Sequence, residues 1–307
     1  MSAWAVAARR GASWPVMAFT RFKALRARGM PLLCVGYILL VAVLAAFPTF
    51  IAPDEPLHID LEDSFNPPFW QSGGDASHLL GADRLGRDQL SRMIHGARIS
   101  MVVSFATVVI GGIVGLVAGL VSGYVGGWIE SVIQRLVDAV MSIPIILVAL
   151  AMVVALGPGP TLFSTPVNII VIISAFIWAG YARVLRSEVL SVKEREFVLA
   201  ARVIGATTPR ILRVHIFPNV APILIVIVTG TLGTVILFEA GLSFLGAGVP
   251  PPNPSWGNMV NDGRSFIEIA WWVSFFPGLA ILLLVLSFNL LGDWLRDVLD
   301  PRLRGII

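Results

Sequence analysis

Long apolar windows separated by short charged segments form the dominant pattern of this sequence. A membrane-spanning helix needs about 20 mainly apolar residues. Five windows reach that length with almost no charged side chain, and they cover residues 29–53, 99–129, 139–182, 214–238 and 269–292. The third window is too long for one helix and is interrupted by Gly157-Pro158-Gly159-Pro160, so it is expected to hold two helices.

This pattern predicts an all-α membrane protein with six transmembrane helices. Their expected ranges are roughly 31–52, 99–122, 136–156, 167–185, 219–246 and 272–292. The segment 79–98 is predicted to form a short helix that enters the second span. That span carries Gly112, Gly115, Gly119 and Gly123, a stripe of small residues that allows a second helix to approach closely. The proline-rich segment 242–264 is expected to be a rigid, non-helical excursion.

The composition supports the bilayer as the solvent of this chain. Charged residues make up 13% of the 307 residues, and the mean hydropathy is +0.84. Soluble domains have about 25% charged residues. The one cysteine, Cys34, lies in the first apolar window, which excludes an internal disulfide or a multi-cysteine metal site. The basic start and apolar stretch of residues 1–52 resemble a signal peptide, but the stretch is too long for one, so we expect an uncleaved span.

The distribution of the 22 Lys and Arg residues predicts the orientation of the helices. With the N-terminus in the cytosol, 17 of them lie inside and five outside, in agreement with the positive-inside rule. Both termini are then cytosolic, as an even number of spans requires. The outer loop also holds a run of acidic residues, Asp54, Glu55, Asp60, Glu62 and Asp63. Because topology explains the basic excess, the pI near 9.5 does not indicate a nucleic-acid partner.

This topology divides the chain into four expected segments. Residues 1–30 form a basic cytosolic tail, and residues 31–98 form the first transmembrane helix with an extracytoplasmic loop. Residues 99–292 form a five-helix core that includes a cytosolic loop at 186–218, and residues 293–307 form a cytosolic C-terminal tail.

The cytosolic loop has the pattern of a short helix pair. Phe197, Ala200, Ala201 and Ile204 are expected to share one helical face, and Gly205 to end that helix. Thr208 and Pro209 then resemble an N-cap and a first-turn proline, and Pro218 lies where the chain re-enters the membrane. The small Ala200–Ala201 face would let the backbone of a partner come close. The loop's arginines would pair with acidic groups of that partner or with lipid phosphates. A helix pair that touches only lipid head groups is the alternative.

Catalytic chemistry is not indicated by the motifs. The chain has no G-x-x-x-x-G-K-[ST] phosphate loop and no H-E-x-x-H motif, so we expect no catalytic residues and no metal site. Glu239 lies inside an apolar window, where a carboxylate is costly and a candidate for function. With Asn258 and Asp262 it is a candidate for the transport pathway or for an inter-subunit contact. A proton-driven secondary transporter that uses Glu239 is one alternative function, and a membrane-embedded enzyme is a weaker one.

The cytosolic loop resembles the coupling motif of permease subunits of ATP-binding-cassette (ABC) importers, E-A-A-x-x-x-G followed further on by I-x-L-P. The matching residues are Leu199-Ala200-Ala201, Gly205 and His215-Ile216-Phe217-Pro218. Leu199 stands where the motif has Glu, and His215 and Phe217 replace Ile and Leu. Further segments resemble the C-type permease of dipeptide and oligopeptide importers: residues 80–88, 96–100, 242–246, 254–258 and 288–297, and Asp300-Pro301-Arg302.

The resemblance implies a type I ABC importer permease fold in the bacterial inner membrane. It implies a homologous second permease, two cytosolic ATPase subunits that carry ATP and Mg, and an extracytoplasmic peptide-binding protein. This chain would bind no cofactor itself. The residues implied in ATPase coupling are Arg195, Glu196, Leu199, Ala200, Ala201, Gly205, His215 and Pro218. Dipeptides, longer peptides, glutathione-like molecules and nickel chelates all remain open as cargo.

Overall fold

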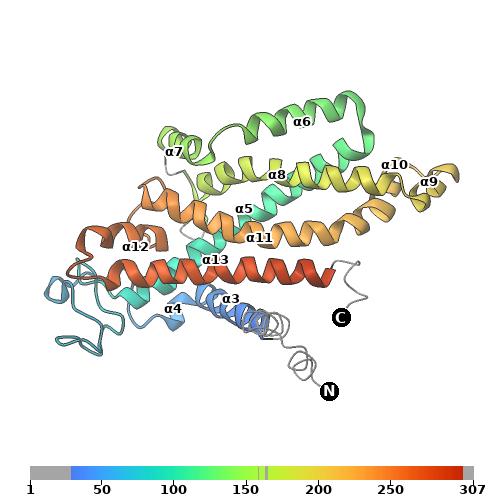
Figure 1. Ribbon diagram of the computed structural model, residues 1–307. Helices are drawn as coiled ribbons and strands as arrows, with labels where there is room; N and C mark the ends of the chain where they lie inside the picture. Colours follow the sequence, from blue (N-terminus) through green and yellow to red (C-terminus); the bar gives the residue numbers. More distant parts are fainter. Residues whose placement is uncertain (1–28, 158, 163–164, 300–307) are drawn as a thin grey trace, which may run out of the picture.

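The computed structural model describes residues 29–157, 159–162 and 165–299, and almost all regular structure in these ranges is helical. Residues 1–28 of the basic tail expected over 1–30 lie outside the described residues, as does the Asp300-Pro301-Arg302 group. Long helices run side by side in a bundle, with short helices and loops at its two ends (Figure 1).

The elements follow in this order. The first half of the chain contains α3 (Met30–Ala46), α4 (Pro48–Ile51), the 3-10 turn η1 (Leu61–Asp63), α5 (Gln89–Val125), α6 (Gly127–Met141), α7 (Ile145–Leu156), and the two-residue strands β1 (Thr161–Leu162) and β2 (Thr165–Pro166). The second half contains α8 (Val167–Lys193), α9 (Glu196–Val203), α10 (Thr208–Arg210), the π-helix η2 (Ile211–Ile216), α11 (Phe217–Phe244), α12 (Trp256–Gly263), the 3-10 turn η3 (Arg264–Phe266) and α13 (Trp272–Leu299).

Four helices among the described residues are long and apolar enough to cross a membrane: α5, α8, the continuous run Thr208–Phe244, and α13. The pair α6 and α7, which is bent by 85°, is a fifth candidate span, and α3 is a shorter apolar helix. The bend follows Ser142 and Ile143, where Pro144 begins α7 in an extended conformation. A proline cannot continue the hydrogen bonds of α6, so the chain turns there.

Several predicted helix boundaries differ from those in the structure. The segment 79–98 is predicted from the sequence to form a short helix that enters the second span. Its residues 89–98 are the first turns of that span itself, so α5 begins at Gln89 and not near residue 99. The Asp88 side chain caps α5 by accepting from the Ser91 amide at 2.7 Å. Helix α8 continues to Lys193 and α13 to Leu299, beyond the ends expected at residues 185 and 292. The excursion 242–264 is not wholly irregular, because it contains α12.

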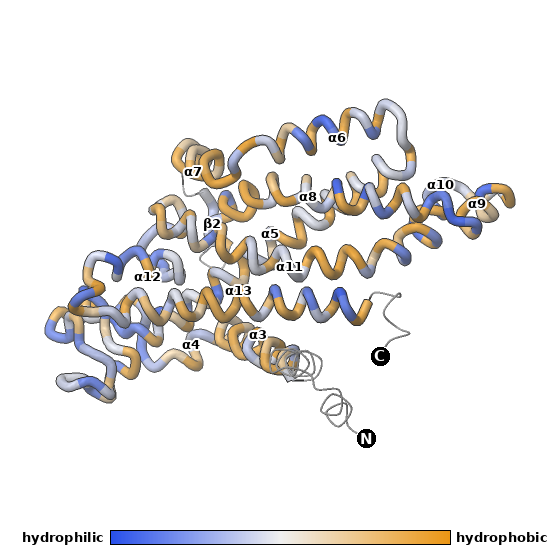
Figure 2. The backbone as a smooth tube through the Cα atoms, in the orientation of Figure 1, coloured by the Kyte–Doolittle hydropathy of each residue, from blue (hydrophilic) through white to orange (hydrophobic). Residues whose placement is uncertain are grey.

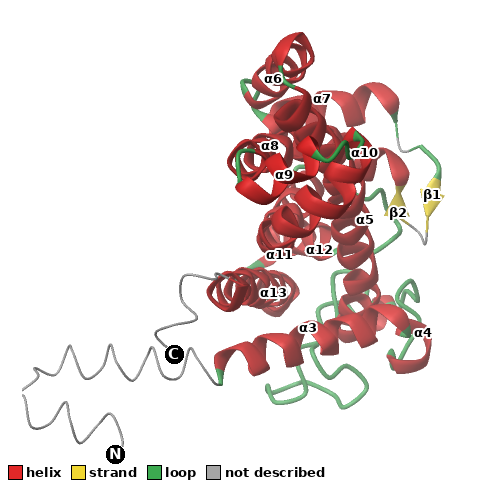
Figure 3. Ribbon diagram, turned by 90° about the vertical axis from the view of Figure 1, so that its right-hand side faces the viewer, coloured by secondary structure: helices red, strands yellow, loops and turns green. Residues whose placement is uncertain are grey.

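The bundle has two ends, which are built from different segments of the chain. We call one the loop end, which comprises residues 53–98 and α12, and the other the α9 end, which comprises α9 and α10 (Figure 1). Apolar residues dominate the middle of the long helices, and polar residues gather at both ends (Figure 2). Seen from the α9 end, α6 lies at one edge of the bundle and α3 at the other, beside α13 (Figure 3).

The glycine stripe of α5 brings the backbone of this helix close to α8. A Cβ atom placed at Gly111, Gly115, Gly119 or Gly123 would lie 2.5–2.7 Å from side-chain atoms of Ile177, Tyr181, Leu185 and Val189, one residue per turn of α8. Any real side chain would clash there, so the two backbones approach only because these positions are glycine. The packing role predicted for the stripe is confirmed, but the stripe starts at Gly111, since a Cβ at Gly112 would meet nothing closer than 3.9 Å.

We expect Gly115→Ala to destabilise the chain by about 1–3 kcal/mol, because the added methyl group would meet the Tyr181 Cβ and the Trp178 carbonyl. Gly36→Ala in α3 is the matched control, since its Cβ would meet nothing within 4 Å. Thermal unfolding of the detergent-solubilised chain measures both variants. Equal melting temperatures for the two would contradict the packing role of the stripe.

Candidate functional site

The α9 end is built on a helix that ends as the sequence predicts. Gly205 follows α9 with a φ of +83°, a conformation that glycine adopts at little cost. The Gly205 amide donates to the Arg202 carbonyl at 3.1 Å, and the Ala206 amide donates to the Ala201 carbonyl at 3.0 Å. This pair of bonds is a Schellman motif, which turns the chain back after α9. The next helix is capped one residue earlier than expected, at Thr207 and not at Thr208.

One residue of the predicted contact face of α9, Ala201, is buried, whereas Phe197, Ala200 and Ile204 are exposed. Ala201 is only 4% exposed, and it packs with Val198 against Ile211 and Ile216 of this same chain. The buried face of α9 therefore attaches the helix to the bundle, and Ala201 is not available to another protein. The spacing of apolar residues could not separate the two faces, because α9 has apolar residues on both.

The exposed side of α9 ends in an apolar tip. Val203 and Ile204 are 87% and 84% exposed, and Phe197 and Leu199 are about half as exposed. We call Val203 and Ile204 the α9 tip. Exposure of two large aliphatic side chains to water costs free energy, and this cost is removed only when another surface covers them. The sequence analysis missed Val203, which lies outside the i, i+3, i+4, i+7 set.

The remaining residues predicted for coupling lie around this tip. Arg195, Glu196 and Ala200 are exposed, Leu199 is 40% exposed, and Pro218 is exposed in the first turn of α11. His215 is half-buried, with its ring 6.4 Å from that of Phe197. The structure thus brings Arg195, Glu196, Leu199, Gly205 and His215 to one end of the molecule.

The α9 end is connected rigidly to the long helices. The Lys193 ammonium donates to the Gly123 carbonyl at 3.0 Å, which satisfies the last turn of α5. The Arg202 guanidinium lies 5.6 Å from the centre of the Tyr124 ring. A force applied to α9 would therefore reach α5 as well as α8 and α11.

Glu239 is enclosed within the bundle and has no exposed surface. Its two carboxylate oxygens accept hydrogen bonds from Ser100 of α5 at 3.0 Å and from Ser243 at 2.8 Å. Ser243 also accepts from the Val249 amide at 3.3 Å, in the loop that leads to α12. Glu239 therefore holds α5, α11 and this loop together, which supports the inter-helix role. Sequence reasoning found the carboxylate but not its serine partners.

Asn258 and Asp262 belong to the loop end. The Asn258 side chain donates to the Val249 carbonyl at 2.5 Å, so it braces the same loop. The Asp262 carboxylate lies 3.5 Å from the Arg92 guanidinium and 4.0 Å from that of Arg87. The Arg264 guanidinium lies over the Phe244 ring. Glu239 and Asn258 are thus linked through Ser243 and Val249, whereas Asp262 contacts the arginines of the loop end.

Buried charges attach the loop before α5 to the helices. Asp83 is 3% exposed and pairs with Arg87 at 2.6 Å and Arg92 at 3.0 Å. The Trp272 indole N–H donates to the Ala82 carbonyl at 3.0 Å, and Gln89 donates to the Val273 carbonyl at 2.9 Å. A buried charge of this kind needs its partners, because an unpaired one is strongly destabilising.

His78 adds a titratable group to this end. Its Nδ1 lies 3.3 Å from Asp88, the cap of α5, and its Nε2 lies 3.1 Å from Asp63. Desolvation lowers the pKa of His78, but the hydrogen bonds and charges of Asp63 and Asp88 together outweigh it, and the net pKa is raised. The protonated ring joins the η1 turn to the start of α5.

Comparison with known proteins identifies the family. Residues 115–305 match the model of the binding-protein-dependent transport system inner membrane component. The chain is 46% identical over 268 residues to the dipeptide transport system permease protein DppC of Escherichia coli K12, with 87% of each chain covered. It is 42% identical over 269 residues to the di/tripeptide transport system permease protein DppC of Pseudomonas aeruginosa UCBPP-PA14, covering 88% of this chain and 87% of that relative.

A third relative is named for a different cargo. The glutathione transport system permease protein GsiD of Escherichia coli O1:K1 / APEC is 39% identical over 280 residues, with 91% of this chain and 89% of the relative covered. The chain therefore belongs to the family of binding-protein-dependent transport system inner membrane components. It is a permease subunit of the inner membrane and not an enzyme. This assignment does not favour the proton-driven or enzymatic alternatives.

We expect the stability of the chain to fall as the pH rises through the pKa of His78. A pKa raised in the folded state means that the stabilisation is fully present below the unfolded value of about 6.5 and is lost above the folded value. Melting temperatures of the wild type and of His78→Gln, measured between about pH 5 and pH 9, test this. Their difference should shrink as the pH rises, and a difference independent of pH would refute the assignment.

We expect Glu239→Gln to retain both the fold and transport, because an amide still accepts one serine hydrogen bond. Glu239→Ala should cost about 1–3 kcal/mol, since it leaves the Ser100 and Ser243 hydroxyls unpaired in the bundle. Thermal unfolding and ATP-dependent uptake by the reconstituted transporter measure the two effects. A folded Glu239→Gln variant that no longer transports would instead revive the proton-relay function.

Proposed function

We propose that this chain is a permease subunit of an ATP-driven peptide importer and forms half of its translocation pathway. The observation that carries the proposal is the α9 tip: an exposed aliphatic pair at a helix end that is fastened to three long helices of a transport permease. The related permeases have dipeptide, di/tripeptide and glutathione transport in their names, and all three cargoes are short peptides.

We assign the α9 end to the cytosol. Lys193, Arg195, Arg202, Arg210 and Arg213 all lie at this end, as the positive-inside rule requires. At the loop end, Arg87 and Arg92 are neutralised by Asp83, and exposed acidic residues surround them. The six-span topology counts α3, α5, the bent pair α6–α7, α8, the run through α11, and α13. It places both termini in the cytosol.

The partners follow from this orientation. A cytosolic ATPase subunit covers the α9 tip, and its ATP and Mg supply the energy that this chain cannot generate. A second, homologous permease completes the pathway, and a second ATPase subunit lies beneath it. An extracytoplasmic peptide-binding protein delivers cargo at the loop end. ATP-driven closure of the ATPases moves α9, and the rigid links to α5, α8 and α11 convert that motion into a change of access.

The test is a double substitution at the α9 tip. We expect Val203→Asp with Ile204→Asp to abolish copurification of the ATPase subunits, because a buried aspartate would face an apolar groove. Membrane insertion should stay normal, since both side chains are exposed in this chain. Leu61→Asp is the matched control: Leu61 is 68% exposed, but it lies at the loop end.

Affinity purification of the tagged permease from cells that express the whole transporter gives the result. Retention of the ATPases by the double variant would contradict docking at the α9 tip. Loss of the ATPases from the Leu61 variant would show that the effect is not specific to this end.

A further inference from the structure

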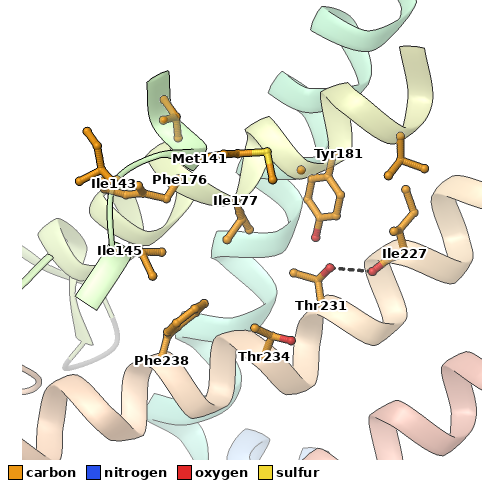
Figure 4. Close-up of a pocket in the computed structure, with 13 residues that line it drawn as sticks. Met141, Ile143, Ile145, Phe176, Ile177, Tyr181, Ile227, Thr231, Thr234 and Phe238 are labelled. Carbon is orange, nitrogen blue, oxygen red and sulfur yellow. Dashed lines mark hydrogen bonds between the residues drawn. The ribbon is translucent and has the colours of Figure 1, made fainter. Parts of the chain in front are cut away.

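A cavity of about 470 Å³ opens between the α6–α7 bend, α8 and α11. Most of its wall is apolar, with Met141, Phe176, Ile177 and Phe238 among the lining residues (Figure 4). Three hydroxyls interrupt this wall, those of Tyr181 on α8 and of Thr231 and Thr234 on α11. An apolar cavity of a few hundred Å³ with a few polar groups has the character of a small-molecule site.

The Tyr181 hydroxyl points into this cavity toward Thr231 (Figure 4). Tyr181 is 2% exposed, and its hydroxyl is buried without a well-formed hydrogen bond in the described part of the chain; the contact with Thr231 is loose. Thr231 itself donates to the Ile227 carbonyl at 2.7 Å. Buried hydroxyls are normally paired, so this one is expected to gain a partner in the working protein.

A second cavity of about 360 Å³ continues along the same helix face. The two cavities share Ile227, Thr231 and Thr234, which lie at i, i+4 and i+7 on α11. The second adds Asn289, Asp293 and Arg296 of α13, toward the α9 end. One stripe of α11 thus borders both cavities, which together we call the α11 track. The track becomes more polar toward the proposed cytosolic side.

Two glycines line this track without being needed for packing. Gly180 borders the first cavity and Gly230 the second, and a Cβ atom at either would meet nothing within 4 Å. This differs from the α5 stripe, where every glycine is in close contact. Glycine at an open wall lets the backbone of another molecule approach closely.

We propose that this stripe of α11, together with Tyr181, is the surface of this chain over which the cargo passes, and that the cargo is read there through its peptide backbone. The inference rests on the proposed peptide-import function and deepens it. Thr231 and Thr234, which are respectively half-buried and exposed, offer hydroxyls to amide and carbonyl groups, while the apolar wall accepts side chains without selecting among them. The Tyr181 hydroxyl is buried in this structure and becomes available when the helices repack during transport. At the end of the track where a peptide would leave, α13 provides polar and charged groups of both signs to its two termini, from Asn289, Asp293 and Arg296.

A helix of the second permease is the competing occupant of the first cavity. A helix that fills the first cavity would not explain a track that ends among Asn289, Asp293 and Arg296. The gradient from apolar to charged favours a molecule that moves along the track.

The first test is kinetic and uses the complete transporter in proteoliposomes, with labelled alanyl-alanine as the probe. Tyr181→Phe and Thr234→Val each remove one hydrogen-bonding hydroxyl, so we expect the KM for uptake to rise roughly fivefold. Thr229→Val is the matched control on α11, because Thr229 is 9% exposed, donates to the Ile225 carbonyl and lines neither cavity. An unchanged KM in both cavity variants would overturn the inference.

The second test asks what covers Thr234, which is exposed in the isolated chain. Cys34 is the one native cysteine, so Cys34→Ala permits a single reporter, Thr234→Cys. We expect a small thiol reagent to label the reporter in the assembled transporter and excess alanyl-alanine to protect it. No labelling in any nucleotide state would show that a permease helix covers the site, and labelling without protection would place it off the path.

These outcomes are separable from failure of the proposed function. If the wild-type transporter takes up no peptide, the proposed function fails. If it takes up alanyl-alanine and the cavity variants behave like Thr229→Val, only the α11 track is wrong.

Discussion

The contact between α5 and α8 is the constraint on which the other parts of this structure depend. Four glycines spaced one turn apart let the two backbones meet, and each accepts one residue of α8. In a bilayer the solvent is as apolar as the side chains, so close packing, and not burial from water, must hold such helices together. The same pair of helices ends next to α9, and Lys193 closes that end on the last turn of α5.

The two ends of the bundle are held by different chemistry. At the α9 end, an aliphatic cluster around Val198, Ala201, Ile211 and Ile216 supports a helix whose other side is free to meet a partner. At the loop end, buried charges and tryptophan hydrogen bonds attach residues 82–92 to α12 and α13. In the proposed function, α9 must move against its partner without detaching from its own chain, whereas the loop proposed to receive a binding protein must keep its shape. The two kinds of support suit these two tasks.

Polar groups inside the bundle fall into two classes. Glu239 has both oxygens satisfied by serines of this chain, so it stabilises a junction and offers nothing to cargo. Tyr181 lacks a well-formed hydrogen bond and borders a cavity. A titratable group in a membrane helix attracts a functional interpretation first, yet here the Tyr181 hydroxyl makes the better candidate, because it lacks a well-formed hydrogen bond among the described residues and its residue borders a cavity.

The sequence alone determined the class of fold, the apolar windows, the glycine contact and the helix–Gly–helix form of the α9 end. These depend on local properties: the length of an apolar run, the backbone freedom of Gly205, and the spacing of small residues. The sequence did not show which face of a helix is buried when both faces carry apolar residues, as in α9. Ala201 looked accessible but is covered by Ile211 and Ile216, and Val203 was overlooked although it is exposed. The partners of Asp262 and the cavity stripe of α11 were decided by tertiary structure, because each depends on which distant helix lies alongside, and no local pattern encodes that neighbour.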